Sequence, residues 1–245
     1  MAQGSSSRPR FTIDHGAETE ETLVAGFAEF GLAGLTAVDY LTDQWEMTET
    51  GHLSADGLPA ITPFQNGTPR HHTRLYSDGG EFTVLVGELA VPPVAGEALA
   101  ESILSWAAEK GIEEVTLLSG VPVPHGPDEH VPFYVATEDY QRHRLTGDPV
   151  RPMGSGFLDG VTAQLVQQGI DTDLRVGLLT TPVHAQAPDA DAALRLVEAL
   201  TTVYDLDIDT SPLAEFATEV DEHYRALADR IEEAREDAPE DRMYM

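Results

Sequence analysis

Cysteine is absent from the 245 residues of this chain, and long apolar runs are absent as well. Without cysteine the chain has no disulfide, no zinc site built on thiolates, no iron–sulfur cluster and no cysteine nucleophile. No run reaches the roughly 18 apolar residues that a membrane-spanning helix needs. The first residues, MAQGSSSRPR, lack the apolar segment of a signal peptide, and we expect residues 1–10 to form a flexible leader. These absences favour a soluble cytoplasmic protein with no membrane partner.

Positive charge is also scarce. The chain has 43 Asp and Glu against 14 Lys and Arg, which gives a formal charge of −29 at pH 7. Lys110 is the single lysine. A chain this negative repels phosphate backbones, so nucleic acid is excluded as a partner class. High acidity with almost no lysine is typical of cytoplasmic proteins from salt-loving microorganisms, because at molar salt a Debye length of about 3 Å screens the repulsion between carboxylates. We therefore interpret the acidity as an adaptation of the surface to its solvent.

The apolar residues recur with the periods of strands and helices. Strands are predicted at residues 11–15, 23–27, 47–53, 60–64, 72–76, 81–89, 115–118, 131–136 and 174–179, and helices at 32–45, 97–110, 138–145, 157–168, 188–204 and 212–235. Strands that alternate with helices indicate a parallel sheet covered on both faces. Turn dipeptides such as Asn66-Gly67 between residues 47 and 89 indicate that this sheet is mixed. We predict an α/β fold, a three-layer α/β/α sandwich with a mixed, mostly parallel sheet, in a single domain of residues 11–235.

The common catalytic motifs are missing. A phosphate-binding P-loop needs a lysine followed by Ser or Thr, whereas Lys110 precedes Gly111. A Schiff-base lysine would have to be Lys110, which we predict to face solvent at a helix end. The GxSxG motif of α/β-hydrolases and the HExxH motif of zincins are both absent. His71 and His72 adjoin a predicted strand and would face opposite sides of it, so we interpret them as surface histidines.

Two weaker patterns remain. One is the loop containing His125, Asp128, Glu129 and His130, which follows a buried strand, as ligand-binding loops of open α/β sheets do. It is interpreted as a solvated loop, with a metal or catalytic site as the alternative. The other is Gly154-Ser155-Gly156 ahead of a predicted helix, where backbone N–H groups could hold an anion. We favour the interpretation that these glycines allow a helix to pack closely on the sheet.

The last predicted helix carries one apolar stripe, which can pack on its own domain or against a partner helix, and we favour the former. Its members are Leu213, Phe216, Ala217, Val220, Tyr224, Leu227, Ile231 and Ala234. Residues 236–245 form a tail, acidic at first and containing Pro239, that we expect to be flexible. It closes on Met243-Tyr244-Met245, an apolar tip with a carboxylate that suits a pocket on a partner.

This tip resembles the hydrophobic–Tyr–any-residue docking motif by which proteasomal ATPases and assembly chaperones enter pockets between proteasome α-subunits. The body of the chain, from about residue 20 to 235, resembles the archaeal proteasome assembly chaperone family, beginning with GFAEFGLAG at residues 26–34. The other segments that carry the resemblance are residues 37–41, 87–92, 103–107, 111–112, 117–120, 156–160, 167–170, 178–182 and 188–193.

The resemblance implies a fold like that of nucleoside phosphorylases and related hydrolases, without their catalytic residues. It implies a homo-oligomer that binds proteasome α-subunits or the core particle without ATP, cofactor or metal. Docking would use Met243, Tyr244 and Met245. Two alternatives on the same scaffold remain open: a small-molecule hydrolase or phosphorylase-like enzyme with its site in the loop of residues 125–130, and a protein that binds a small anion at residues 154–156.

Overall fold

The computed structural model describes residues 8–77, 80–123, 126, 129–147, 149–184, 188–220 and 222. In these residues a nine-stranded sheet has the order β1-β3-β6-β7-β2-β8-β11-β9-β10. Its strands are β1 Arg10–His15, β2 Thr22–Phe27, β3 Glu49–Asp56, β6 Thr73–Tyr76, β7 Thr83–Gly87, β8 Glu114–Val121, β9 Phe133–Ala136, β10 Arg151–Pro152 and β11 Arg175–Pro182. A separate hairpin pairs β4 Phe64–Gln65 with β5 Thr68–Pro69. The helices are η1 Phe30–Leu32, α1 Ala33–Gln44, α2 Pro93–Lys110, α3 Glu138–Arg144, α4 Gly160–Ile170 and α5 Ala190–Tyr204.

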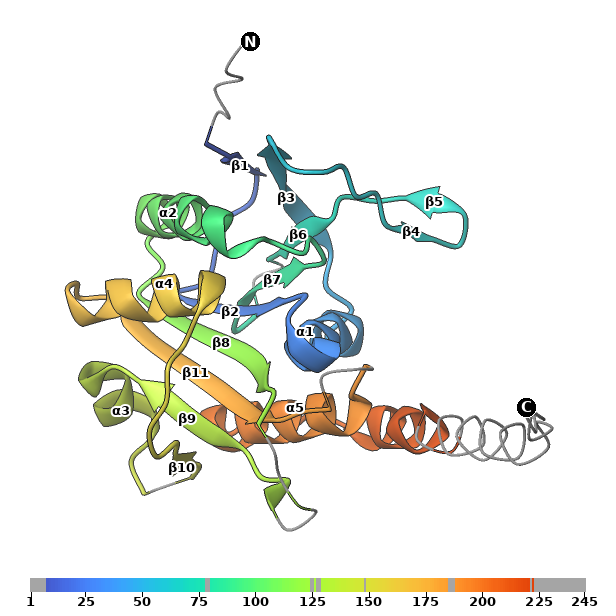
Figure 1. The fold of residues 1–245 in the computed structure, drawn as a ribbon, viewed down its shortest axis with the longest axis vertical. Coiled ribbons are helices and arrows are strands. Elements are labelled where there is room, and N and C mark those ends of the chain that lie inside the picture. The colour runs from blue at the N-terminus through green and yellow to red at the C-terminus, as the bar shows by residue number, and fades with distance from the viewer. Residues whose placement is uncertain are drawn as a thin grey trace, which may run out of the picture.

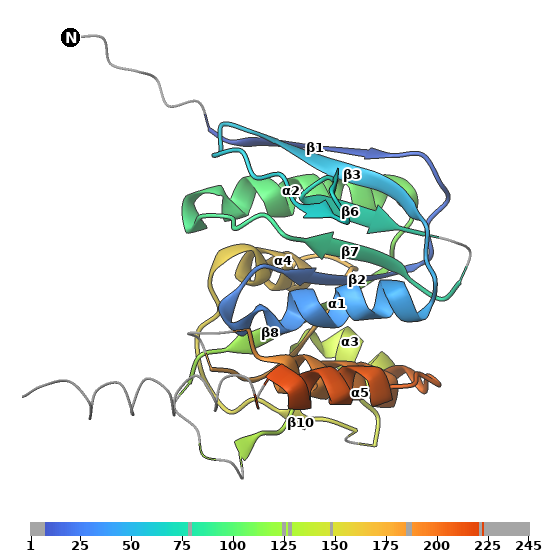
Figure 2. The ribbon, with the colours of Figure 1, turned by 90° about the vertical axis from the view of Figure 1, so that its right-hand side faces the viewer.

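The centre of the sheet is parallel and its flanks are mixed. The pairs β7–β2, β2–β8 and β8–β11 are parallel, whereas β1–β3, β3–β6, β6–β7 and β11–β9 are antiparallel. Helices α1 and α5 lie on one side of the sheet and α2 and α4 on the other (Figures 1 and 2). The predicted three-layer α/β/α arrangement with a mixed sheet is therefore confirmed.

Alternation along the central strands divides the core into two clusters, one on each side of the sheet. On β2, Val24 packs into the cluster that contains Val38 of α1, whereas its neighbours Leu23 and Ala25 pack into the cluster that contains Ile103 of α2. All five side chains are essentially buried. This is why the central strands are apolar at successive positions rather than at every second one.

Two glycines let α1 approach the sheet backbone. A Cβ added to Gly34 in the first turn of α1 would overlap the carbonyl of Leu118 on β8, and a Cβ added to Gly26 on β2 would overlap the carbonyl of Gly34. The first turn of α1 therefore lies directly on β2 and β8. This contact fixes the position of residues 28–32, the short segment between β2 and α1.

The segment between β3 and β6 differs from the prediction. Residues 60–64 were expected to form a strand, but only Phe64 joins one, in the β4–β5 hairpin that projects from the body of the molecule (Figure 1). Pro59 and Pro63 remove two backbone donors from this stretch, which makes a longer ladder unfavourable. The Asn66-Gly67 turn was predicted correctly, and both of its residues have the positive φ, 50° and 78°, of a tight hairpin turn.

Two helix boundaries also differ. Helix α2 begins at Pro93 rather than at residue 97, since proline fits the first turn of a helix, where its missing N–H needs no partner. Helix α4 begins at Gly160 rather than at residue 157, and Gly169 lies inside it instead of ending it. Gly160 has φ 62°, so the regular helix starts only after this residue.

Lys110 was predicted to face solvent, but its ammonium group is bound by the protein. Its Nζ donates hydrogen bonds to the carbonyl oxygens of Ala17, at 3.0 Å, and His15, at 3.4 Å. The end of α2 is therefore tied to the segment that joins β1 to β2. Gly111 ends the helix with φ 79°, as its position in the sequence predicts.

A buried carboxylate lies at the amino end of β8. Glu114 is fully buried and accepts hydrogen bonds from Arg144 Nε at 2.7 Å, Arg175 Nε at 3.0 Å and the Tyr204 hydroxyl at 2.9 Å. Three donors from three elements compensate the loss of water around one charge. This arrangement ties α3, α5 and β11 together.

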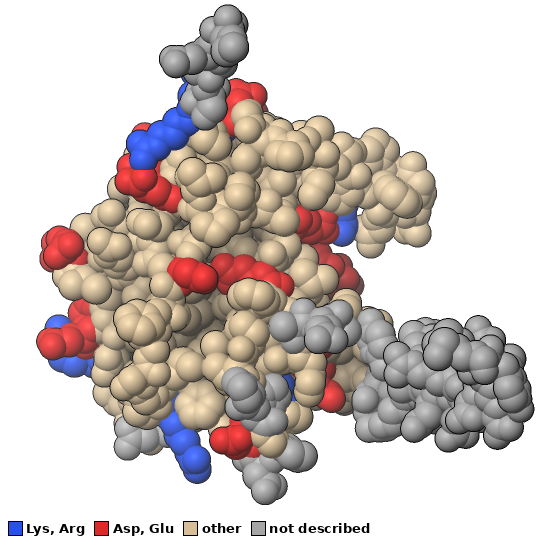
Figure 3. Space-filling model, viewed as in Figure 1, with Lys and Arg blue, Asp and Glu red and all other residues tan. Residues whose placement is uncertain are grey.

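The described part of the last helix, residues 211–220, packs on the cluster that contains α1 and α5. Leu213 and Ala217 of the predicted stripe are buried, whereas Phe216 remains half exposed. No described helix is both long enough and apolar enough to cross a bilayer. On the face shown in Figure 3, acidic side chains occur across the middle as well as at the rim, and the basic ones lie at the periphery.

Candidate functional site

The sequence-predicted sites fall largely outside the described residues. Met243, Tyr244 and Met245 lie there, as do His125 and Asp128. The docking role of the tail therefore stays a prediction.

The rest of the loop of residues 125–130 is described. Glu129 accepts a hydrogen bond from the backbone N–H of Gly126 at 2.7 Å, and the His130 ring lies edge-on to the His184 ring, with centroids 5.8 Å apart. The His184 Nδ1 is 3.1 Å from the carboxylate of Asp189. Within the described parts of the chain, no three His, Asp or Glu side chains gather closely enough to hold a metal ion.

The feature best suited to bind a ligand is a pocket of about 1120 Å³ that opens at the carboxyl ends of β2, β8 and β11. After β2 the chain forms β3, β6 and β7, which lie on one side of β2 in the sheet. It then returns through α2 to form β8 on the other side of β2. The carboxyl ends of parallel strands beside such a reversal are where open α/β sheets bind ligands. We therefore treat this pocket as the candidate functional site.

Glu29 is the central polar group of the pocket. It is the second residue after β2 and directly precedes η1. The chain then turns through Gly31 and Leu32, both with positive φ, 66° and 52°, to start α1. The close contact of α1 with the sheet holds this turn, so the Glu29 side chain is directed by the packing of α1.

Two hydroxyl groups hold the Glu29 carboxylate. The Ser119 hydroxyl donates to Oε2 at 2.6 Å, and the Thr162 hydroxyl lies 3.1 Å from Oε1 and 3.2 Å from Oε2. Burial raises the pKa of Glu29 above its ordinary value, while the two hydroxyls act in the opposite direction and the nearby Asp159 carboxylate raises the pKa further. Glu29 is thus a carboxyl group that is costly to ionise and whose two partners here are neutral.

The glycines at residues 154–156 do not have the predicted role. A Cβ added to Gly154 or Gly156 would meet no atom within 4 Å, so neither residue allows close packing of a helix on the sheet. Both line the pocket instead. Gly96 of α2, by contrast, allows close packing of α2 against the start of α4, because its Cβ would lie 3.1 Å from the carbonyl carbon of Gly160.

The first turn of α4 is next to the Glu29 carboxylate. A Cβ on Gly160 would be 4.0 Å from Oε1 of Glu29, and Thr162 in the same turn donates to that carboxylate. The N-terminus of a helix attracts negative charge, and here a side chain of the protein itself supplies it. A small anion at residues 154–156 would meet Glu29 and Asp159, and this arrangement disfavours the anion-binding alternative.

Sequence reasoning did not identify this carboxyl group. Glu29 lies within GFAEFGLAG and Ser119 within LLSG, two segments that carry the family resemblance. A charged residue two positions after a strand that is buried on both faces was the available signal. The second hydroxyl partner could not be found in this way, because Thr162 is 133 positions from Glu29 along the chain.

Comparison with known proteins supports the resemblance. Residues 23–228 match the PAC2 family. The crystal structure of Pyrococcus furiosus PbaA, described as an archaeal homolog of proteasome-assembly chaperone, superposes with a TM-score of 0.78 at 22% identity, covering 92% of this chain and 99% of that one. Pyrococcus furiosus PbaB, described as an archaeal proteasome activator, gives a TM-score of 0.76 at 20% identity over 89% and 99%.

A curated relative, the uncharacterized protein MJ0106 of Methanocaldococcus jannaschii, is 23% identical over 209 residues, which is 85% of either chain. The family match covers most of this chain, and the structures above share its fold. The resemblance drawn from the sequence is thereby confirmed, and the chain belongs to the PAC2 family.

Proposed function

We propose that this protein is a non-enzymatic chaperone or adaptor of the proteasome core, which binds α-subunits without ATP. The observation that carries the proposal is the PAC2 match over residues 23–228, together with the shared fold of PbaA and PbaB, whose descriptions name proteasome assembly and proteasome activation. The fold alone does not specify which residues bind the partner. The binding segment is therefore proposed from the terminal residues.

Binding is proposed to use Met243-Tyr244-Met245. Tyr244 supplies an aromatic ring and a hydroxyl that can hydrogen-bond, and the two methionines beside it are apolar. Residues of this kind commonly fill pockets on a binding partner. The motif is preceded by acidic residues, a composition that favours solvation of a segment.

The protein is proposed to act as a homo-oligomer. One tripeptide buries little surface and binds weakly. Several tails on one oligomer can engage several pockets at once, which raises the avidity by about 10²–10⁴-fold when the spacing fits. An oligomer that presents one tail per protomer therefore suits a ring of α-subunits.

The test is a pull-down of purified proteasome α-subunits at molar salt with the wild-type chain, a variant lacking residues 243–245 and Tyr244→Ala. We expect both changes to abolish binding and to leave the circular dichroism spectrum and the oligomer mass unchanged. Glu240→Ala, which alters the tail outside the motif, is the matched control and should bind like the wild type. Undiminished binding by the truncated chain would exclude the docking role of the tail.

A further inference from the structure

The charged side chains that line the pocket at the carboxyl end of the sheet are all acidic in the described residues. Two carboxylates, those of Glu29 and Asp159, are among its lining residues. The described residues that line it include no lysine, arginine or histidine. Glu29 is partly buried, its two hydroxyl partners are neutral, and no cation of the described pocket wall is available to it.

The rest of the wall is mainly apolar. Side chains from five parts of the fold contribute to it: Val91, Val121, Val135, Met153, Leu158 and Leu178. A carboxylate beside apolar groups gains strongly from a cation, because burial penalises an uncompensated charge. Two hydroxyl donors leave part of the acceptor capacity of a carboxylate unused. The raised pKa of Glu29 is consistent with a group that lacks a cationic partner.

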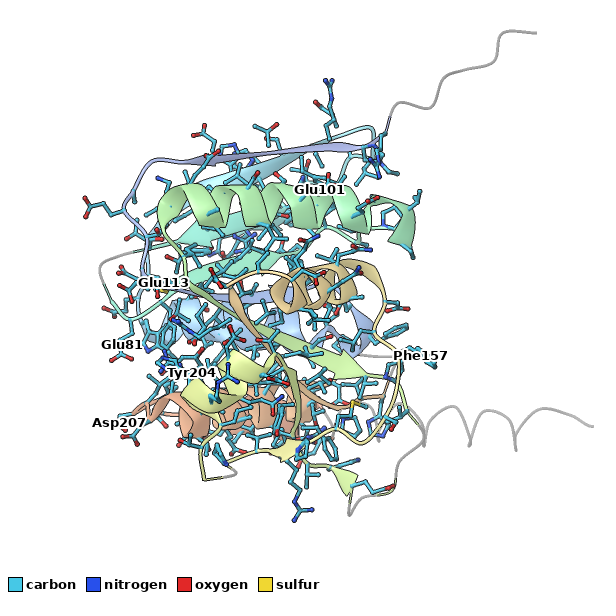
Figure 4. The ribbon with its side chains drawn as sticks, turned by 90° about the vertical axis from the view of Figure 1, so that its left-hand side faces the viewer. Glu81, Glu101, Glu113, Phe157, Tyr204 and Asp207 are labelled. Atoms are coloured by element: carbon cyan, nitrogen blue, oxygen red, sulfur yellow. The ribbon has the colours of Figure 1, made fainter. Side chains whose placement is uncertain are left out.

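The mouth of the pocket carries exposed aromatic rings. Phe30 is 50% exposed, and Phe157 is fully exposed and points away from the body of the molecule (Figure 4). Both belong to the pocket lining. An aromatic side chain such as Phe30 at the entrance suits a ligand that is itself apolar and that carries positive charge. The volume of about 1120 Å³ leaves room for a ligand of ordinary cofactor or drug size.

We propose that this pocket binds a small organic cation, an apolar body that carries one amine or guanidine group. The cationic group lies on the Glu29 carboxylate between the Ser119 and Thr162 hydroxyls, and the apolar body lies against the wall near Leu178. Asp159 adds to the negative potential at the same end. This role is separate from the proposed docking by the tail, and neither depends on the other.

The first experiment uses the wild-type chain and three probes of the same shape. Isothermal titration calorimetry is carried out with 2-phenylethylamine, 2-phenylethanol and phenylacetate in one buffer and at one salt concentration. We expect the amine to bind at least about tenfold more tightly than the alcohol, which corresponds to about 1.4 kcal/mol, and phenylacetate to show no heat of binding. Equal affinity of amine and alcohol, or no binding of the amine, would overturn the proposal.

The second experiment locates the binding. Glu29→Gln keeps the shape of the side chain and removes its charge, so the amine should lose about tenfold in affinity and bind no better than the alcohol. Glu101→Gln, an exposed acid on α2 (Figure 4), is the matched control and should bind the amine like the wild type. Unchanged amine binding by Glu29→Gln would refute the assignment. If Glu29→Gln did not fold, as judged by circular dichroism, the three-probe comparison on the wild type would still decide.

Discussion

Replacing Gly34 by alanine tests the contact that positions the candidate site. The added Cβ would overlap the carbonyl oxygen of Leu118, a backbone atom that cannot rotate away. Helix α1 would have to retreat from β8. The retreat would disturb Glu29 as well, because the turn that carries Glu29 leads directly into α1.

The cost of this retreat can be worked from the burial of α1. Val38 and Leu41 are both fully buried against the sheet, and side chains of this size contribute about 1.5–3 kcal/mol each when buried. A gap of about 0.5–1 Å forfeits a quarter to a half of the contact energy, so these two side chains lose about 1–3 kcal/mol together. Alanine gains about 0.5–1 kcal/mol over glycine in a helix. Since Ala33 and Ala37 retreat too, we expect a net loss of about 2 kcal/mol.

The assay is urea unfolding followed by circular dichroism, with Gly154→Ala as the matched control. A Cβ at Gly154 meets no atom within 4 Å and Gly154 does not have positive φ, so its free energy of unfolding should stay within about 0.5 kcal/mol of the wild type. The expected result is therefore a difference in the free energy of unfolding between two Gly→Ala variants, at Gly34 and at Gly154. If Gly34→Ala were as stable as Gly154→Ala, α1 could not lie directly on β8, and the account of how Glu29 is positioned would be wrong.

Three further predictions concern ionised groups. Glu114→Ala leaves two arginines without their shared carboxylate and should lower the free energy of unfolding by about 3–5 kcal/mol, whereas Glu113→Ala, at an exposed neighbour, should change it by less than about 0.5 kcal/mol; equal losses in chemical denaturation would contradict this. Because burial raises the pKa of Glu29 above its ordinary value of 4.5, the folded state holds this proton more tightly, and the contribution of Glu29 to stability should fall as the pH rises from 4.5 through the raised value. Glu29→Gln should lack this pH dependence, so its free energy of unfolding should increase relative to the wild type as the pH rises. Parallel pH profiles of the two proteins would contradict this. Asp189→Ala removes the side chain that caps α5 and should lower the thermal midpoint through a loss of about 1 kcal/mol, while Asp191→Ala, in the first turn of the same helix, should have a smaller effect.

Much of the architecture was predictable from local pattern. The apolar run within residues 81–89 was predicted as a strand and forms the buried β7, and Gly111 and Asn66-Gly67 marked a helix end and a hairpin. Predictions from the local pattern were wrong where missing backbone donors or a special backbone conformation determine the secondary structure. The extended segment near Pro63 was expected to be a strand, and the start of α4 was placed before Gly160.

The site was less predictable than the fold. Its carboxyl group comes from the end of β2, one hydroxyl from β8 and the other from α4, so no window of sequence contains them together. The glycines of residues 154–156 were interpreted as packing glycines, whereas a Cβ on Gly154 or Gly156 would meet no atom and both residues line the pocket. Burial decides the role of Glu29, and burial depends on contacts between distant segments.

The contact between Lys110 and the carbonyl groups of Ala17 and His15 has a practical consequence. Because no other lysine occurs in the sequence, amine-directed labelling of side chains is confined to one position, and that position is engaged in the folded state. The rate at which an acylating reagent modifies Lys110 therefore follows the opening of one defined junction, where the end of α2 meets the segment between β1 and β2. Mass spectrometry of a single peptide would then report local opening at that junction without any engineered probe.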